Sequence, residues 1–355
     1  SRWMKRIVRL AQHFMAGPVC VTGGSGFLGS WCIKLLLEDG YRVHTTTRSA
    51  KKAAYLMDLP GAASRLTIFE GVDLLTPGAF DAAITGCEAV LHTASPFYVK
   101  GGSEEKLVTP AVEGTKNVLA SCHKLGVKKV ALTSSTGSVY VNYGTVPAEH
   151  VYTCDDWSPA ELLREKQNWY CLSKVLAEEM AWKMSKEADC PFKLTVLLPT
   201  LIWGPMVPGQ PHLNTSANVL VGYMDGSVKE IENACKTVVD VRDVARAHIE
   251  AIARDVGGER ILLIGGSPHF EEVARYIREA LPEEMKEKVP SKVSQRLGSA
   301  VNGPAPPLPV LYDVSPAEKL LGIHFQSVET QVKSMVQSML ENGFKNAKQY
   351  APGTM

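Results

Sequence analysis

A glycine-rich turn between a short apolar segment and a helical pattern is the feature that most constrains the fold. The segment Val19–Thr22 is followed by Gly23, Gly26 and Gly29, spaced three residues apart. Glycine lets the backbone turn sharply and approach a phosphate, and a helix that begins there points free N–H groups at it. This context is typical of dinucleotide binding. An ordinary tight turn between a strand and a helix is the alternative.

Extended segments alternate with helical patterns through the first 200 residues, and the helical patterns include Trp31–Glu38 and Ala111–Leu125. Almost wholly apolar strands separated by helices indicate parallel β-α-β units, whose right-handed crossovers place helices on both faces of a sheet. The sequence therefore predicts an α/β fold, a Rossmann-type doubly wound parallel sheet with a smaller, mostly C-terminal substrate-binding region. The expected strands are Val19–Thr22, Tyr41–Thr47, Leu66–Glu70, Ala89–Ala94, Lys129–Ser134 and Leu194–Leu198.

Composition argues against several classes of partner. Lys and Arg number 38 against 37 Asp and Glu, so no net field favours nucleic acid. No apolar run reaches the roughly 18 residues of a membrane-spanning helix. The eight cysteines form no C-x-x-C pair and the nine histidines no H-E-x-x-H motif, so no metal site is expected. We expect a cytoplasmic protein with reduced thiols, a monomer or homodimer that binds neither nucleic acid nor membrane.

The end of the second expected strand indicates which dinucleotide binds. NAD-binding proteins usually carry Asp or Glu there, about 20 residues past the glycines. Here Arg48 takes that place, and Lys51 and Lys52 follow. A guanidinium and an ammonium suit a 2′-phosphate, so NADP(H) is favoured over NAD(H). A solvated basic patch is the alternative. Asp73 and Leu74 end the third strand and either flank the adenine or form a plain strand-end turn.

The candidate catalytic side chains are Tyr170, Lys174 and Ser135. Tyr170 and Lys174 are four residues apart on an expected helix and so face the same way. An ammonium one turn away is expected to lower the pKa of the phenol from its usual value near 10, which makes the pair a usable general acid. Ser135 lies where the fifth strand ends, and capping of the next helix is its alternative role.

These motifs resemble those of extended short-chain dehydrogenases/reductases. The phosphate turn, "VLHTASP", "LTSSTGSV", Tyr-x-x-x-Lys and "VVDVRDVARAHI" occur in the family's order, over roughly Val19 to Phe344. More narrowly, the chain is similar to dihydroflavonol reductases, cinnamoyl-CoA reductases, vestitone reductase and related aldehyde reductases. The resemblance implies a Rossmann fold, NADPH, and hydride transfer to a carbonyl carbon.

The resemblance also implies residue roles. Tyr170 would protonate the developing alkoxide, Lys174 would hold the nicotinamide ribose and tune Tyr170, and Ser135 would position the carbonyl oxygen. Asn117 matches a position that can organise a proton relay through water. Apart from the resemblance, His92 ends a buried strand and is expected to be a packed histidine hydrogen-bonded to backbone. The cofactor contacts are expected from Gly23, Ser25, Gly26, Phe27, Leu28, Gly29, Arg48, Lys52, Asp73, Leu74, Thr93, Ala94, Ser95, Ser134, Tyr170, Lys174, Pro199, Thr200 and Ile202.

The match is weaker at the positions that select substrates. Where cinnamoyl-CoA reductases place His and Lys, this chain has Val219 and Gly222, although Arg242 matches their Arg. Tyr140 stands where dihydroflavonol reductases typically have Asn. We therefore expect an aromatic or medium-sized aldehyde or ketone, with a cinnamoyl-CoA-type thioester as the alternative. The candidate substrate contacts are Phe97, Thr136, Tyr140, Trp203, Asn214 and Tyr223.

Three parts of the chain are expected. Residues 1–17 form a leader or flexible N-terminal extension, in which residues 1–16 are basic and carry no acid. A targeting peptide, an added leader and translation from upstream of Met15 would all look like this. Residues 18–199 form the NADP-binding Rossmann domain. Residues 200–355 form mainly the substrate-binding region, with segments at about 237–250 and 308–315 returning to the Rossmann domain.

Two other functional classes remain open. An epimerase or dehydratase would keep its dinucleotide bound and return the hydride. Such enzymes usually hold NAD and carry an acid after the second strand, where this chain has Arg48. A non-enzymatic NADP(H) sensor would not need Ser135, Tyr170 and Lys174, and all three are present.

Overall fold

The computed structural model describes residues 17–95, 103–147, 149–211, 215–297, 299–300, 303–304 and 308–343 of the 355-residue chain. Within these ranges, no helix combines the length and the apolar character that crossing a membrane requires.

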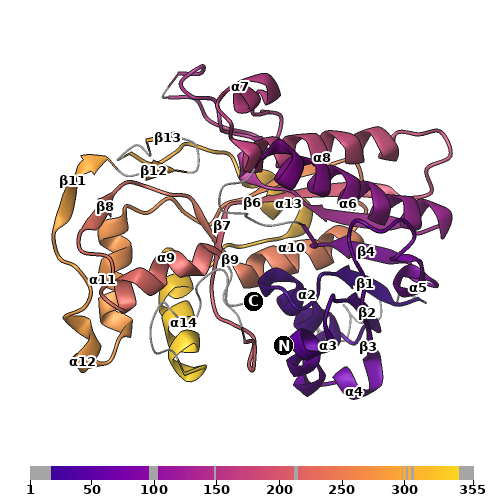
Figure 1. Ribbon diagram of the computed structural model, residues 1–355, viewed down its shortest axis with the longest axis horizontal. Coiled ribbons are helices and arrows are strands. Elements are labelled where there is room, and N and C mark those ends of the chain that lie inside the picture. Colours follow the sequence, from indigo (N-terminus) through magenta and orange to yellow (C-terminus); the bar gives the residue numbers. More distant parts are fainter. Residues whose placement is uncertain are drawn as a thin grey trace.

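A seven-stranded sheet is the centre of the described structure (Figure 1), and its neighbouring strands are paired in parallel. The strand order is β10-β6-β5-β4-β1-β2-β3. The chain builds the sheet outward from β1 in one direction through β2 and β3, and then in the other direction from β4 onward, so β1 and β4 flank the switch point. Such a switch point opens a crevice at the carboxyl ends of the strands, where ligands bind. The predicted doubly wound α/β fold is confirmed. The strands are β1 Val19–Thr22, β2 Val43–Thr46, β3 Leu66–Phe69, β4 Ala89–His92, β5 Lys129–Thr133, β6 Lys193–Pro199 and β10 Arg260–Leu263.

Helices cover both faces of the sheet (Figure 1). On one face α2 (Phe27–Glu38) packs against α10 (Val241–Ala253), and on the other α6 (Glu104–Lys124) packs against α8 (Trp169–Ser185). The apolar residues of α2 and α10 belong to one hydrophobic core cluster, and those of α6 and α8 to two others. The sheet is therefore covered on both sides, which explains its almost continuously apolar strands.

The structure differs from the predicted elements in three places. α2 begins at Phe27 rather than at Trp31. β10 was not among the expected strands, although it is as short and apolar as β1, because its place beside β6 depends on a pairing between residues 64 positions apart. The helix expected to begin at Ala111 begins at Glu104, because Ser103 accepts a hydrogen bond from the Lys106 amide and two acids occupy the first turn. Pro110 lies inside this helix.

The remaining elements are short segments beside the sheet and a C-terminal group. The former are α3 Ala50–Ala53, η1 Ala54–Asp58, α4 Ala62–Arg65, α5 Asp81–Ile84, η2 Thr136–Ser138 and α7 Ala160–Glu165. The latter are β7 Leu201–Trp203, α9 Thr215–Met224, β8 Ile231–Asn233, β9 Val238–Asp240, α11 Phe270–Ala280, α12 Glu283–Lys286, β11 Val293–Leu297, β12 Ser299–Ala300, β13 Gly303–Pro304, α13 Ser315–Leu321 and α14 Val328–Glu341. The division into domains stays a prediction.

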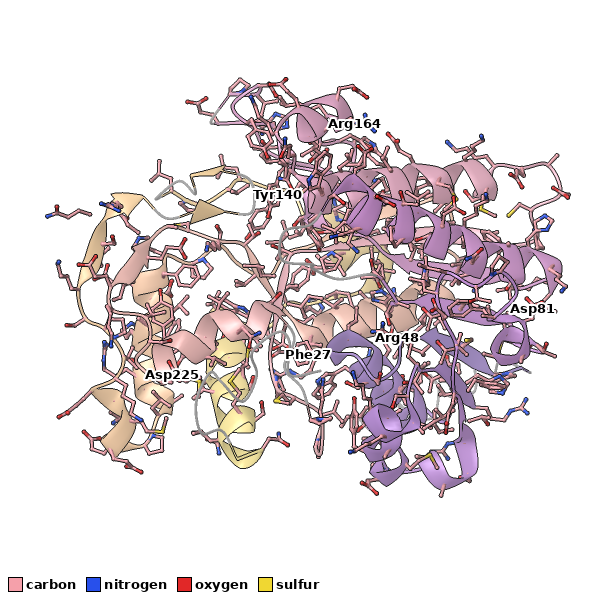
Figure 2. All side chains as sticks on the ribbon, viewed as in Figure 1. Phe27, Arg48, Asp81, Tyr140, Arg164 and Asp225 are labelled. Atoms are coloured by element: carbon pink, nitrogen blue, oxygen red, sulfur yellow. The ribbon has the colours of Figure 1, made fainter. Side chains whose placement is uncertain are left out.

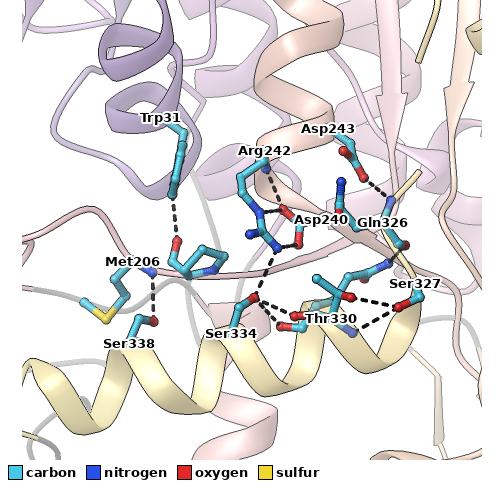
Figure 3. A network of polar contacts seen from close by, with 12 residues as sticks. Trp31, Met206, Asp240, Arg242, Asp243, Gln326, Ser327, Thr330, Ser334 and Ser338 are labelled. Carbon is cyan, nitrogen blue, oxygen red and sulfur yellow. Dashed lines mark hydrogen bonds and ion pairs between the residues drawn. The ribbon is translucent and has the colours of Figure 1, made fainter. Parts of the chain in front are cut away.

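A polar network ties α14 to the start of α10 (Figure 3). Asp240 is fully buried, accepts a hydrogen bond from the Arg242 amide, and holds the Arg242 guanidinium through Nε at 2.8 Å and Nη2 at 2.7 Å. Arg242 Nη2 also donates to Ser334 Oγ on α14 at 3.2 Å. Asp243 accepts from the Gln326 amide at 2.7 Å. The first half of α14 and the residue before its cap are thereby joined to a helix that covers the sheet.

Asp243→Asn is expected to stabilise the protein more at pH 8 than at pH 5. Burial is the main cause that raises the pKa of Asp243 from 3.8 to about 7. Between those values the folded state holds a proton that the unfolded state has released, so the free energy of unfolding falls as pH rises. The full cost of holding Asp243 ionised in the folded state, at most about 4 kcal/mol, applies above pH 7. Urea denaturation of both proteins at pH 5 and pH 8 measures the difference in the free energy of unfolding. The exposed control Asp58→Asn should show no such pH-dependent gain, and an equal gain for Asp243→Asn at both pH values would contradict the expectation.

Candidate active site

The glycine turn after β1 is closed and sterically tight. Gly23 has a φ of 70°, a left-handed value that favours glycine, and the Gly26 amide donates to its carbonyl oxygen at 3.0 Å. A Cβ on Gly29 would lie 2.6 Å from that same oxygen and 2.9 Å from the Cα of Gly24. Gly29 therefore has no room for a side chain while the helix stays this close to the turn.

The N-terminus of α2 fits an anionic group. Gly26 is the N-cap and offers no side-chain cap, and no acid occupies the first turn. The amides of that turn and the positive end of the helix dipole are thus available to a pyrophosphate. The Ser25 carbonyl accepts from the Tyr55 hydroxyl at 3.2 Å, while Phe27 and Leu28 are buried beneath the turn.

Two basic residues follow β2 at the same edge of the sheet. The Gly24 amide donates to the Thr46 carbonyl at 3.2 Å, which holds the glycine turn against the end of β2. Arg48 comes two residues later and is exposed, and it makes no ion pair within the described part of the chain. Lys52 is half-buried nearby in sequence. In Figure 2, Phe27, the first residue of α2, and Arg48 are both labelled near the middle of the view. This edge suits a ribose that carries an additional phosphate.

The segment after β3 is held by Asn117. The Asp73 carboxylate accepts from the Leu75 amide at 2.8 Å, and Asn117 Nδ2 donates to the Leu74 carbonyl at 3.0 Å. The Leu74 side chain packs on Gly114 of α6, where a Cβ would meet it at 2.4 Å. The amide nitrogen of Asn117 is therefore used to hold this turn, and we do not carry the relay role implied for Asn117 into the proposed mechanism.

The end of β4 connects the glycine turn to Lys174. Thr93 Oγ1 donates to the Thr22 carbonyl at 2.6 Å, and the Ala94 amide donates to Thr22 Oγ1 at 3.1 Å. Ser95 Oγ accepts from Lys174 Nζ at 3.2 Å. His92 is buried, as expected, but its Nδ1 lies 2.8 Å from the Thr22 hydroxyl rather than bonding to backbone. Burial, and next the charge of Lys174, lower the pKa of His92 to about 3, so its ring is neutral at physiological pH.

Ser135, Tyr170 and Lys174 come together beside this segment. The side chains of Ser135 and Tyr170 share a hydrogen bond, and Lys174 Nζ lies 5.8 Å from the centroid of the Tyr170 ring. Ser135 Oγ also accepts from the Gly137 amide at 3.0 Å and so caps the short helix η2. Capping and a place in the site are therefore compatible. A phenol, an ammonium and a hydroxyl converge here at the carboxyl end of the sheet.

Burial, rather than the neighbouring ammonium, dominates the pKa of Tyr170. It raises that pKa to about 12, and the hydrogen bond with Ser135 acts in the opposite direction. The net shift is therefore upward rather than the expected lowering, because burial outweighs the preference of Lys174 for a phenolate. The phenol is fully protonated at neutral pH and can serve as a proton donor. Burial also lowers the pKa of Lys174 to about 8, against the charge of Glu178, which raises it.

Other expected cofactor contacts have their side chains occupied. Ser134 Oγ donates to Glu178 Oε2 at 2.6 Å, so the Ser134 side chain points into the protein. Thr200 is buried and its Oγ1 donates to the Thr237 carbonyl at 2.9 Å. Pro199 ends β6 beside Leu263, and Ile202 lies on β7 beside Val239. Contacts from these four residues would come mainly from their main chain.

The expected substrate contacts divide into three groups. Thr136 is buried in η2, and the Tyr140 hydroxyl lies 3.0 Å from Thr237 Oγ1, with Tyr140 above the centre of the view in Figure 2. Trp203 and Tyr223 belong to the hydrophobic core and pack on the same aromatic ring, that of Phe270, so we do not keep them as substrate contacts. Phe97 and Asn214 lie outside the described residues.

The sequence did not single out Glu178, Arg260 or Thr237. Glu178 contacts Ser134, Thr237 contacts Tyr140, and Arg260 contacts Glu178 and Ser138. For Glu178 a signal existed, because it follows Tyr170 and Lys174 at the same four-residue spacing. For Arg260 and Thr237 none did, because these partners are 82 to 122 residues away in the chain.

Comparisons with known proteins agree with this geometry. A family model described as "NAD dependent epimerase/dehydratase family" matches residues 19–265. The chain is 38% identical over 345 residues to cinnamoyl-CoA reductase CAD2 of Medicago truncatula, covering 95% of this chain and 100% of that one. Yeast methylglyoxal/isovaleraldehyde reductase Gre2, solved with NADPH, superposes with a TM-score of 0.79 at 28% identity, covering 92% and 98%. Vestitone reductase from alfalfa superposes with a TM-score of 0.72 at 30% identity, covering 92% and 99%.

Arg48→Asp is expected to move cofactor preference from NADPH toward NADH. The substitution removes a cation that suits the 2′-phosphate and adds a carboxylate that suits ribose hydroxyls. The ratio of kcat/KM with NADPH to that with NADH should fall at least about tenfold, since a charge-assisted hydrogen bond contributes about 1.5–3 kcal/mol. Arg42→Asp, the same change at the other end of β2, is the matched control. An unchanged ratio for Arg48→Asp would refute the placement of the 2′-phosphate.

Proposed function

The chain belongs to the NAD dependent epimerase/dehydratase family, and on that premise we propose that it reduces the carbonyl of an aromatic or medium-sized aldehyde or ketone with NADPH. It is an oxidoreductase that uses NADP(H), like the reductases to which it is similar. The observation that carries the proposal is the convergence of Ser135, Tyr170 and Lys174 beside Thr93–Ser95 and the glycine turn.

The residues present fit a bound NADP(H). The amides of the first turn of α2 would hold the pyrophosphate, Arg48 and Lys52 the 2′-phosphate, and Lys174 the nicotinamide ribose. When bound, the nicotinamide supplies the hydride. The chain's own groups would then do the rest of the chemistry: Ser135 orients the carbonyl oxygen by a hydrogen bond and Tyr170 donates its proton to it.

Lys174 supports the proton donor in this mechanism. Its ammonium favours the phenolate that Tyr170 becomes after it has given up the proton. Because burial destabilises that phenolate, the charge of Lys174 matters more than it would in water. The ion pair would therefore form during the reaction rather than before it.

A free carbonyl compound is the better substrate class than an acyl-CoA thioester. Arg242 is the one matching basic anchor, and its guanidinium is engaged by buried Asp240 and by Ser334. Val219 and Gly222 on α9 offer no charge to a CoA phosphate. Thioester reduction stays the second candidate, because the chain is 38% identical to a cinnamoyl-CoA reductase.

We place the enzyme in the cytoplasm, as a monomer or homodimer acting on a small molecule. The near balance of 38 basic and 37 acidic residues and the reduced cysteines support this placement. Light scattering of the purified protein measures the oligomeric state.

Aromatic aldehydes and ketones are expected to support NADPH consumption at least about tenfold faster than cinnamoyl-CoA at equal concentrations. The physical reason is that the matching arginine already pairs with buried Asp240 and donates to Ser334, so binding a CoA phosphate would compete with these contacts. The measurement is NADPH oxidation with a panel of aldehydes, ketones and acyl-CoA thioesters, with free CoA as an added inhibitor. Faster turnover of the thioester, or competitive inhibition by CoA, would favour the second candidate.

Tyr170→Phe is expected to lower kcat at least about a hundredfold while NADPH still binds. The change removes the proton donor and keeps the ring, and general acid catalysis contributes about 10²–10⁴ in rate. NADPH binding is followed by fluorescence and turnover by product formation. Tyr276→Phe on α11, which removes a hydroxyl that donates to Glu272 at 2.7 Å, is the matched control. Retained turnover in Tyr170→Phe would rule out the phenol as the donor.

A further inference from the structure

A buried carboxylate lies beneath the serine turn. Glu178 follows Lys174 by four residues on α8, as Lys174 follows Tyr170, and its side chain is fully buried. Residues four apart share a helix face, so the three side chains form one row. Lys174 and Glu178 line the same small cavity, together with His92, Ser95 and Ser134. The mechanism above does not use Glu178.

The contacts of Glu178 hold both ends of the turn that carries Ser135. Glu178 Oε2 accepts from Ser134 Oγ at 2.6 Å and from Ser138 Oγ at 2.8 Å. Ser138 Oγ also lies 2.8 Å from the Ser135 carbonyl oxygen. A hydrogen bond to a carboxylate is about twice as strong as one between neutral groups. The position of Ser135 against Tyr170 therefore depends on this carboxylate.

Arg260 on β10 is the counter-ion of Glu178. Its Nε lies 2.5 Å from Glu178 Oε1, and the two side chains are 10% and 0% exposed. The guanidinium also donates to the carbonyls of Cys154 and Asp156 and covers the Trp157 ring at 3.7 Å. Burying two charges costs more than packing apolar side chains of similar volume. A role in stability alone does not account for this pair.

We propose that Glu178 is a positioning residue of the reduction: from beneath the site it fixes the turn that carries Ser135 and favours the charged form of Lys174. The inference rests on the proposed function. The titratable or charged groups around Lys174 are Tyr170, Cys171 and Glu178 on α8 and His92 on β4, and Arg260 lies beyond Glu178. Glu178 supplies the one carboxylate among them. Its charge raises the pKa of Lys174, which burial lowers to about 8.

Glu178→Gln tests the role, with Glu179→Gln as the matched control on the exposed side of the same helix. In Glu178→Gln the alkaline limb of the kcat profile is expected to move at least about one unit to lower pH, since a neighbouring opposite charge shifts a pKa by about 1–3 units. We expect kcat at neutral pH to fall at least about tenfold and the KM for NADPH to change less than about twofold. A pH profile that superposes on that of the wild type would overturn the role.

A second variant separates positioning from folding. Glu178→Gln leaves Arg260 buried without its counter-ion, which destabilises a protein strongly. The double variant Glu178→Gln with Arg260→Met removes both charges. The expected result is that the thermal midpoint recovers toward that of the wild type while kcat and the pH profile stay altered. Recovery of kcat together with the thermal midpoint would show that the pair acts only through stability.

A direct titration of Lys174 needs no substrate. NMR of protein labelled on its lysine side chains, with the signal assigned by Lys174→Met, gives its pKa in wild type and in Glu178→Gln. We expect the variant's value to be lower by at least about one unit. A wild-type enzyme that consumes no NADPH with any carbonyl compound would overturn the proposed function. One that does, with the same Lys174 pKa in both proteins, would overturn the role of Glu178 alone.

Discussion

The pairing of β1 with both β2 and β4 is the constraint on which the rest of the structure depends. Val19 is paired with Val43 on one side and with Ala89 on the other, so the glycine turn emerges where the strand order reverses. The Gly24 amide and Thr22 side chain then tie that turn to the ends of β2 and β4. A change that shifts β1 would therefore move three parts of the site together: the amides at the start of α2, the residues Arg48 and Lys52 after β2, and the segment Thr93–Ser95 after β4.

Much of the fold followed from local patterns. Apolar runs predicted six of the sheet strands with ends correct to within two residues, because most of these strands, such as β1 and β4, are buried on both faces and largely apolar. β10 was missed because its pairing with β6 joins residues 64 positions apart, which no local pattern shows. The start of α6 was missed because the helical pattern was read only from Ala111, whereas the cap at Ser103 begins the helix earlier.

The candidate site was less completely predictable. The sequence predicted Ser135, Tyr170 and Lys174, and the structure brings them together. Two aromatic residues after β6, Trp203 and Tyr223, were predicted to contact substrate. Both instead pack on Phe270, which follows them by 67 and 47 positions in the chain. The pKa of Tyr170 depends on how much protein surrounds it, and burial is a property of the folded chain that no spacing encodes.

The place of β10 at the edge of the sheet has a consequence for how the protein is made. During synthesis, β6 emerges more than 60 residues before Arg260–Leu263, and until then its apolar edge has no neighbour on that side. An unpaired apolar edge is where nascent chains associate with one another. The same late strand brings Arg260 to Glu178, so closing that edge and neutralising the carboxylate under the serine turn are one event. A nascent chain whose synthesis pauses before Arg260 would therefore expose the unpaired edge of β6, which favours aggregation, and would lack the counter-ion of Glu178 beneath the serine turn.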